Sequence, residues 1–121
     1  MSIDHAFARR FAEEWVTVWN SRDLEGVLAH YTDDVVFASP RIVTLFGDPS
    51  GEVRGKEALR AYWAKALELL PDLHFTLEDV RVSVDTIVIN YRNERGIAVS
   101  EGLTFRDGLV CRGFGAYADE V

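Results

Sequence analysis

One carboxylate stands where the sequence pattern predicts a buried face. In "IAVSEGLTF", residues 97–105, the apolar Val99, Leu103 and Phe105 alternate with small or polar residues, and Glu101 falls on their face. Successive side chains of a strand point to opposite faces, so the pattern places Glu101 against the core. An ionised carboxylate there is costly, so burial raises its pKa or demands a partner. We therefore expect Glu101 to be a catalytic acid or base, or a hydrogen-bond donor to a bound carbonyl.

Two structural alternatives to this interpretation of Glu101 stay open. A β-bulge at Gly102 would turn the carboxylate outward. An arginine could also pair with the carboxylate for structural reasons alone. Under either alternative, the residue would serve the fold and not a ligand.

The remaining side chains that commonly do chemistry do not form a recognisable constellation. His5, His30 and His74 are far apart and lack the spacing of metal ligands, so the sequence predicts no metal site. Asp33 and Asp34 are adjacent carboxylates, but neighbours on an emerging strand point to opposite faces. We expect them to order the turn before that strand.

Length and composition predict one domain, residues 1–121, in the cytoplasm. Thirteen basic and 20 acidic residues give a formal charge of −7, which argues against nucleic acid or an anionic membrane as partner. The single cysteine, Cys111, excludes an internal disulfide and is interpreted as an inert core thiol. The charged N-terminus has no apolar signal core, and no apolar run is long enough to span a bilayer.

Helical periodicity dominates the first half of the chain. Apolar residues recur at three- and four-residue steps over residues 4–20, which predicts an amphipathic helix. Asp23 can cap a short second helix that carries Tyr31. The clearest helix begins after Gly55 and stops at Pro71.

Strand-length segments rich in β-branched and aromatic residues fill the second half. Including one short strand from the first half, the predicted strands are residues 33–40, 73–82, 86–93, 97–105 and 109–117. Residues 40–55 are expected to form a loop or an irregular hairpin. Helices followed by a meander of hairpins predict an α+β fold. A curved sheet wrapped around the helices would leave a cone-like cavity.

Three segments carry a family resemblance. "WNSRDLEGVLAHYTDDVVFASP", "VRGKEALRAYW" and "LTFRDGLV" occur in this order along essentially the whole chain. In order and spacing the chain resembles the SnoaL-like and ketosteroid-isomerase-like members of the nuclear-transport-factor-2-like superfamily. The resemblance implies a cystatin-like (NTF2-like) α+β fold, in which a cone-shaped, curved, mixed β-sheet wraps around three N-terminal helices. Such folds host several enzyme classes as well as binding proteins.

The resemblance also implies positions for catalytic groups. The oxyanion-hole tyrosine of ketosteroid isomerases corresponds to Trp15, and their catalytic base corresponds to Ser39 before a proline. Their protonated aspartate corresponds to Glu101, and the acid/base aspartate of SnoaL-type cyclases corresponds to Gly115. Because a serine cannot abstract a C–H proton unaided, steroid isomerase chemistry by the family mechanism is not expected.

Aromatic residues and inward glycines predict a pocket for a flat apolar molecule. In simple hairpin register, Gly113 and Gly115 would share the inward face with Glu101 and leave space beside it. The alternative for the aromatic residues is core packing alone. The predicted ligand-binding residues are Trp15, Trp19, Tyr31, Phe37, Ser39, Tyr62, Trp63, Phe75, Phe105 and Gly115.

These features predict a cofactor-independent enzyme that uses Glu101 on a small oxygenated apolar molecule by isomerisation, cyclisation or dehydration. The alternative is a non-catalytic binding or dimeric interaction module of the same fold. Arg112 and Phe114 share the outer face of the last strand, the face through which members of this superfamily often dimerise. We therefore expect a homodimer through that face, with a solvated face and an exposed aromatic residue as the alternative.

Overall fold

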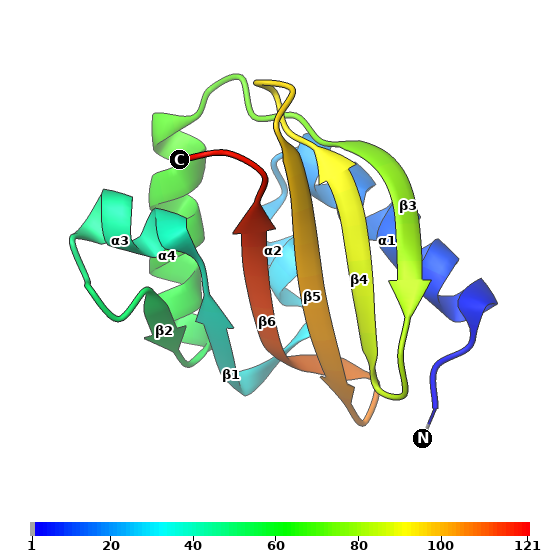
Figure 1. Ribbon diagram of the computed structural model, residues 1–121. Coiled ribbons are helices and arrows are strands. Elements are labelled where there is room, and N and C mark those ends of the chain that lie inside the picture. The colour runs from blue at the N-terminus through cyan, green and yellow to red at the C-terminus, as the bar shows by residue number, and fades with distance from the viewer. Residues whose placement is uncertain (1) are drawn as a thin grey trace.

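A computed structural model describes residues 2–121, and within them six strands form one sheet (Figure 1). The strand order is β2-β1-β6-β5-β4-β3. β1 and β6 are parallel and every other neighbouring pair is antiparallel, so the sheet is mixed. The strands are β1 Tyr31–Ala38, β2 Glu52–Arg54, β3 Thr76–Val82, β4 Thr86–Arg92, β5 Ala98–Arg106 and β6 Leu109–Tyr117.

The helices of residues 2–121 are α1 His5–Asn20, α2 Leu24–Leu28, α3 Pro40–Phe46 and α4 Lys56–Leu69. α1 packs against β3 and α4 packs against β1, so the two long helices cover one face of the curved sheet (Figure 1). The predicted α+β architecture, with N-terminal helices on a curved mixed sheet, is confirmed.

Local caps explain why the helices begin where they do. The Asp4 carboxylate accepts from the Phe7 backbone N–H at 2.7 Å and caps α1. Asp23 caps α2 by accepting from the Gly26 N–H at 3.0 Å, as its sequence position predicts. α1 then turns Trp15 and Trp19 inward and its charged residues outward.

The prediction that residues 40–55 form a loop or irregular hairpin is wrong for much of the segment. Ser39 caps α3, Pro40 occupies its first turn, and Ile42 is fully buried beneath it. Further along, β2 pairs with β1 through Phe37 and Val53. The segment is therefore anchored to the core by one buried residue from the helix and one from the strand.

Two further predictions about the fold require correction. Tyr31 begins β1 instead of continuing α2, because α2 ends at Leu28 and Tyr31 pairs with Val110 of β6. Cys111 is half-buried and not a core thiol. The pairing of β5 with β6 shifts register at Phe105, which leaves Cys111 without a direct partner.

The consecutive hairpins of the second half are confirmed, and their register sets the site. Glu101 on β5 lies opposite Gly115 on β6, and Gly102 lies opposite Phe114. Two residues paired across this ladder point to the same face of the sheet, and successive pairs alternate between the two faces. Glu101 and Gly115 therefore face the helices together, while Phe114 faces outward.

Among residues 2–121, no helix has both the length and the apolar character needed to cross a membrane.

Candidate functional site

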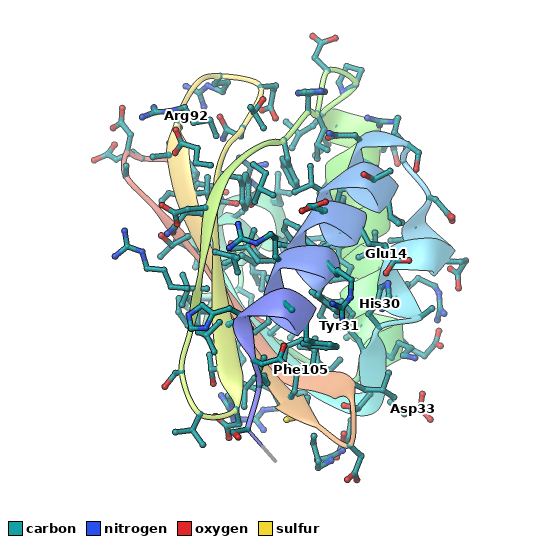
Figure 2. The ribbon with its side chains drawn as sticks, turned by 90° about the vertical axis from the view of Figure 1, so that its right-hand side faces the viewer. Glu14, His30, Tyr31, Asp33, Arg92 and Phe105 are labelled. Atoms are coloured by element: carbon teal, nitrogen blue, oxygen red, sulfur yellow. The ribbon has the colours of Figure 1, made fainter. Side chains whose placement is uncertain are left out.

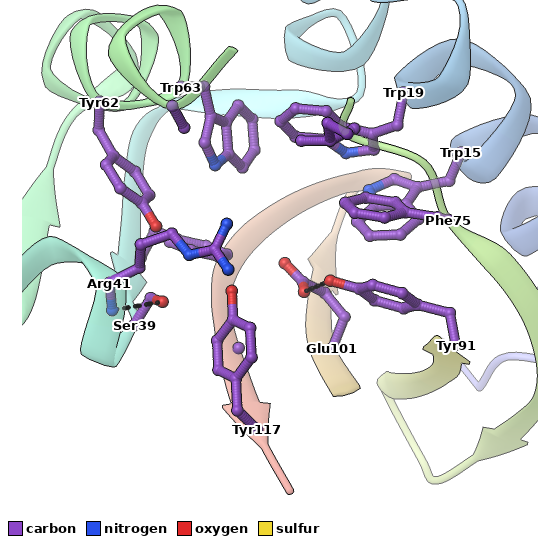
Figure 3. Close-up of a pocket in the computed structure, with 14 residues that line it drawn as sticks. Trp15, Trp19, Ser39, Arg41, Tyr62, Trp63, Phe75, Tyr91, Glu101 and Tyr117 are labelled. Carbon is purple, nitrogen blue, oxygen red and sulfur yellow. Dashed lines mark hydrogen bonds between the residues drawn. The ribbon is translucent and has the colours of Figure 1, made fainter. Parts of the chain in front are cut away.

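A pocket lies between the concave face of the sheet and the helices (Figure 3). Its free volume is about 40 Å³, enough for a few water molecules and too small for an aromatic ring. Its walls are mostly aromatic, with a few polar groups among them. The lining residues are Trp15, Trp19, Phe37, Ser39, Arg41, Tyr62, Trp63, Ala66, Leu73, Phe75, Tyr91, Glu101, Gly115 and Tyr117.

Glu101 is the only carboxylate among these lining residues. The residue is 5% exposed, and the Tyr91 hydroxyl donates to its Oε1 at 3.1 Å. Burial raises the pKa of Glu101 to about 8, against the opposing effects of the Tyr91 hydrogen bond and the positive charge of Arg41. Near neutral pH, Glu101 is therefore a mostly protonated carboxylic acid that can donate a hydrogen bond.

Three tyrosines bring hydroxyl groups to the same pocket. Burial raises the pKa of Tyr62, Tyr91 and Tyr117 above the ordinary value, and the charge of Glu101 adds to the increase. Their hydroxyls therefore stay protonated across the physiological range. In Figure 3, Tyr91 lies on one side of Glu101, and Tyr62 and Tyr117 lie on the other, beside Arg41.

Arg41 reaches the pocket from α3. Figure 3 shows its guanidinium pointing inward between Tyr62 and Tyr117, and its central carbon lies 5.3 Å from the centroid of the Tyr117 ring. Within residues 2–121, Arg41 forms no ion pair with a carboxylate. The structural alternative of an arginine paired with Glu101 is therefore not what is observed, although the charge of Arg41 lowers the pKa of Glu101.

Gly115 and Ser39 form the side of the pocket that faces Glu101. A Cβ at Gly115 would lie 3.6 Å from Glu101 Oε1 and 3.7 Å from Ser39 Oγ, both ordinary contact distances. The absent side chain therefore leaves space next to the carboxyl group. Ser39 Oγ accepts from the Arg41 backbone N–H at 3.2 Å, so this hydroxyl also helps to hold α3 over the pocket.

The tryptophans form the opposite wall and differ in their hydrogen bonding. Trp15 Nε1 donates to the Tyr31 hydroxyl at 3.1 Å. Trp19 is 4% exposed, and its Nε1 has no acceptor within residues 2–121. The Trp19 ring meets Trp63 edge-on with centroids 5.0 Å apart, which fixes the orientation of the indole.

Most of the predicted site residues line this one pocket. Those that do are Glu101 and, of the predicted ligand-binding set, Trp15, Trp19, Phe37, Ser39, Tyr62, Trp63, Phe75 and Gly115. Their roles in binding and catalysis remain predictions. Tyr31 and Phe105 lie outside the pocket. Tyr31 sits behind the tryptophans as the acceptor for Trp15, and Phe105 packs edge-on against Phe7 and Phe11 near the start of α1 (Figure 2).

Sequence reasoning did not include three polar lining residues, Arg41, Tyr91 and Tyr117, in the site. Alternation could have found Tyr91, which follows Ile87 and Ile89 on the inward face of β4. The same parity carries Tyr117 inward after Gly115. No comparable signal existed for Arg41, because its position depends on α3.

The other structural alternative, a bulge at Gly102, is excluded. Gly102 is regularly paired with Val88 and Phe114, and the register shift of β5 comes later, between Thr104 and Phe105. Gly102 instead makes room on the outer face, where the Phe114 ring covers it.

In the part of the chain that the structure describes, no three His, Cys, Asp or Glu side chains lie close enough together to hold a metal ion. His30, half-buried, packs against Phe11 at a centroid distance of 5.1 Å, and its Nε2 lies 3.8 Å from Glu14 (Figure 2).

Comparison with known protein families decides the assignment. The family described as the SnoaL-like domain matches residues 12–113. The chain belongs to the SnoaL-like family. None of the curated proteins matches the chain.

Solved structures agree with this assignment. A SnoaL-like protein of unknown function from Burkholderia thailandensis E264 is 41% identical, with a TM-score of 0.93 and 98% of this chain and 100% of that chain covered. TerC, co-crystallised with polyporic acid, is 19% identical, with a TM-score of 0.75 and 91% and 90% covered. A proposed ketosteroid isomerase from Kribbella flavida DSM 17836 is 18% identical, with a TM-score of 0.73 and 94% and 79% covered. TerC and the Kribbella flavida protein share the fold of this chain.

Proposed function

We propose that this SnoaL-like protein binds a small, oxygenated, apolar molecule in the pocket and transfers a proton to or from it through Glu101. The observation that carries the proposal is a buried carboxyl group, with a pKa of about 8, facing the space left by Gly115. A group whose pKa lies near the working pH is suited to both giving and taking a proton.

The proposed chemistry uses Glu101 in both of its protonation states. At pH 7 about a tenth of the molecules carry the ionised form, given a pKa of about 8. That form removes a proton from a carbon next to a carbonyl, and the electron pair of the C–H bond moves onto the carbonyl oxygen. Protonated Glu101 then returns the proton to another position of the same molecule, which completes an isomerisation and leaves the enzyme unchanged.

The remaining polar groups would stabilise the intermediate and not exchange protons with carbon. The Tyr62 and Tyr117 hydroxyls stay protonated, and Arg41 is positively charged, so each can donate to a developing oxyanion. Ser39 and Gly115 offer no acid or base. The chemistry of this pocket therefore depends on Glu101 alone among the residues that line it.

Proton exchange tests this function without knowledge of the natural substrate. A panel of cyclic enones and aryl ketones is incubated with the protein in D2O, and deuterium uptake next to the carbonyl is followed by NMR. We expect uptake above the uncatalysed rate for compounds that bind, and its loss in Glu101→Gln. Glu68→Gln removes an exposed carboxylate of α4 and serves as the matched control. Equal uptake with wild type and Glu101→Gln would contradict the proposal.

A non-catalytic binding function is the second candidate, and one observation favours it. Ser39 stands where the family resemblance gives a catalytic base and Gly115 where it gives an acid/base aspartate, so Glu101 is the one carboxyl group left among the lining residues. Binding of a compound by wild type with no deuterium uptake and no conversion would support this candidate over the enzyme.

We also propose that two copies of the chain associate through the outer face of the sheet. Phe114 is 44% exposed there, and Arg112 is exposed beside it on the same strand. Exposed aromatic and arginine side chains are typical of interface centres. Light scattering at micromolar concentration should give the mass of two chains, and Phe114→Ala should shift it toward one. A one-chain mass for wild type would contradict the dimer.

A further inference from the structure

The polar groups that line the pocket draw most of their hydrogen-bond donors from one residue, Arg41, which has no acceptor of its own. Arg41 brings five N–H donors, and the Tyr62 and Tyr117 hydroxyls and the Trp19 indole add more. Protonated Glu101 also has an O–H to donate. The side-chain acceptors are the remaining oxygen sites of Glu101 and the hydroxyl oxygens of Ser39, Tyr62, Tyr91 and Tyr117. A ligand that satisfies the guanidinium of Arg41 must therefore bring acceptors.

The positive charge of Arg41 also favours a ligand with acceptor oxygens. Arg41 points into the pocket and forms no ion pair with a carboxylate of residues 2–121 (Figure 3). Glu101 cannot neutralise it near pH 7, since burial keeps that carboxyl group mostly protonated. The pocket therefore carries a positive charge within a chain whose formal charge is −7. A guanidinium in this setting favours a carboxylate or another oxyanion.

Trp19 supplies an independent observation at the opposite wall. Its Nε1–H is buried with no acceptor within residues 2–121, whereas the neighbouring Trp15 Nε1–H has the Tyr31 hydroxyl. A buried donor without a partner costs free energy, and an acceptor atom of a ligand would recover it. Arg41 comes from α3 and Trp19 from α1, so the two donors lie on different walls of one pocket.

From the unpaired guanidinium of Arg41 and the unpaired indole N–H of Trp19, we infer that the ligand is a flat aromatic anion rich in acceptor oxygens. Its charged oxygen, a carboxylate or an acidic enolate, pairs with Arg41. A second acceptor of the ligand faces Trp19. This inference rests on the proposed function, because it names the ligand class of the same pocket.

Because the pocket is small, Arg41 also occupies space that a ligand would need. A free volume of about 40 Å³ admits no aromatic ring while the guanidinium occupies the space between Tyr62 and Tyr117. Binding of a ring therefore requires lining side chains to move, and Arg41, which points into the pocket, has a long side chain that can do so at modest cost. Removing Arg41 should thus weaken the binding of anions without weakening the binding of neutral rings.

Two probes of matched shape test the inference by isothermal titration calorimetry at pH 7. 1-Naphthoate and 1-naphthamide share the same rings and carbonyl and differ by one negative charge. We expect wild type to bind 1-naphthoate at least tenfold more tightly, and Arg41→Gln to remove this preference while 1-naphthamide affinity stays within about twofold. Arg9→Gln, at an exposed position of α1 outside the pocket lining, is the control and should change neither affinity. Thermal melts confirm that each variant is folded.

Three results would overturn the inference, and they separate it from the proposed function. Equal or tighter binding of 1-naphthamide would remove the preference for anions and leave a neutral carbonyl compound as the ligand of Glu101. Unchanged 1-naphthoate affinity in Arg41→Gln would place the anion elsewhere. Failure of wild type to bind either probe would overturn the ligand class, while Glu101-dependent deuterium uptake by a ketone would still support the proposed function.

Discussion

Two neighbouring residue pairs on β5 and β6 use glycine in opposite ways. On the outer face, a Cβ at Gly102 would come within 2.2 Å of the Phe114 ring, which covers the glycine directly. On the inner face, a Cβ at Gly115 would stand 3.6 Å from Glu101 Oε1, an ordinary contact. One glycine accommodates a side chain that is already there, and the other leaves space unfilled.

The comparison shows that the two faces of this strand pair reverse the usual distribution of residues. The outer face carries an exposed aromatic ring, and the inner face carries a buried carboxyl group. Neither arrangement improves the stability of an isolated chain, since the ring remains partly in water and the carboxyl group loses water. Such departures from local preference are expected at functional surfaces. We connect the inner pair with a ligand and the outer pair with a second copy.

The largest expected effect concerns the cost of burying Glu101 and depends on pH. The pKa of Glu101 is about 8 in the folded protein and near 4.5 in an exposed chain, so the folded state holds the proton more tightly. The contribution of Glu101 to stability therefore falls as pH rises from about 4.5 to about 8 and levels off above that. The two pKa values imply a total loss of about 5 kcal/mol.

Urea unfolding of wild type and Glu101→Gln at a series of pH values measures this loss. Glutamine cannot ionise, so the difference in the free energy of unfolding between the two proteins should grow in favour of Glu101→Gln from pH 5 to pH 8. A difference that stays constant over this range would show that Glu101 is not held protonated. Glu101→Leu should follow the same trend from a lower starting point, because it leaves the Tyr91 hydroxyl without its acceptor.

A second carboxylate introduced at Gly115 should increase the cost of ionising Glu101 in the folded protein. In Gly115→Asp the new carboxyl group projects toward Glu101, and two carboxylates in one site cannot both ionise without cost. We expect a loss of roughly 2–3 kcal/mol relative to wild type at pH 8 and a much smaller loss at pH 5. Gly115→Asn, of the same shape and uncharged, is the control. Equal losses for both variants at both pH values would mean that the new side chain points away from Glu101.

The smallest expected effect compares the two glycines as packing positions. Gly102→Ala forces the Phe114 ring to swing away and should cost about 1 kcal/mol. Gly115→Ala makes only contacts of ordinary distance and should be neutral or stabilise by about 0.5 kcal/mol. Equilibrium unfolding measures both variants. In the double variant with Phe114→Ala, the cost of Gly102→Ala should disappear, and additive losses would contradict the packing account.

The sequence was sufficient to place Glu101, because alternation with period two is strict in β5. It did not distinguish Glu101 from Phe105 by depth. Both lie on the inward face, but four residues of strand separate them by roughly 13 Å. Phe105 therefore belongs to the aromatic cluster with Phe7 and Phe11 and not to the pocket. Alternation in the sequence predicts which face of the sheet a side chain lies on. Its position along the strand relative to the pocket depends on tertiary packing.

Arg41 and Tyr31 show why the rest could not be predicted. The seven residues of α3 are too few for a recognisable helical period, and the helix depends on the Ser39 cap and the burial of Ile42. Tyr31 fits the helical spacing of the residues before it, yet pairing with Val110 draws it into β1. In both places a contact distant in sequence overrides the local pattern.

The protonation state of Glu101 is the central claim, and its titration tests that claim most directly. Protein labelled with 13C at the glutamate side-chain carboxyl is titrated from pH 4 to pH 9 by NMR, and the spectrum of Glu101→Gln identifies the Glu101 signal. We predict that this signal moves with a midpoint near pH 8, well apart from those of the exposed glutamates. A midpoint near 4.5 would contradict the account, because Glu101 would then be an ordinary ionised carboxylate at neutral pH.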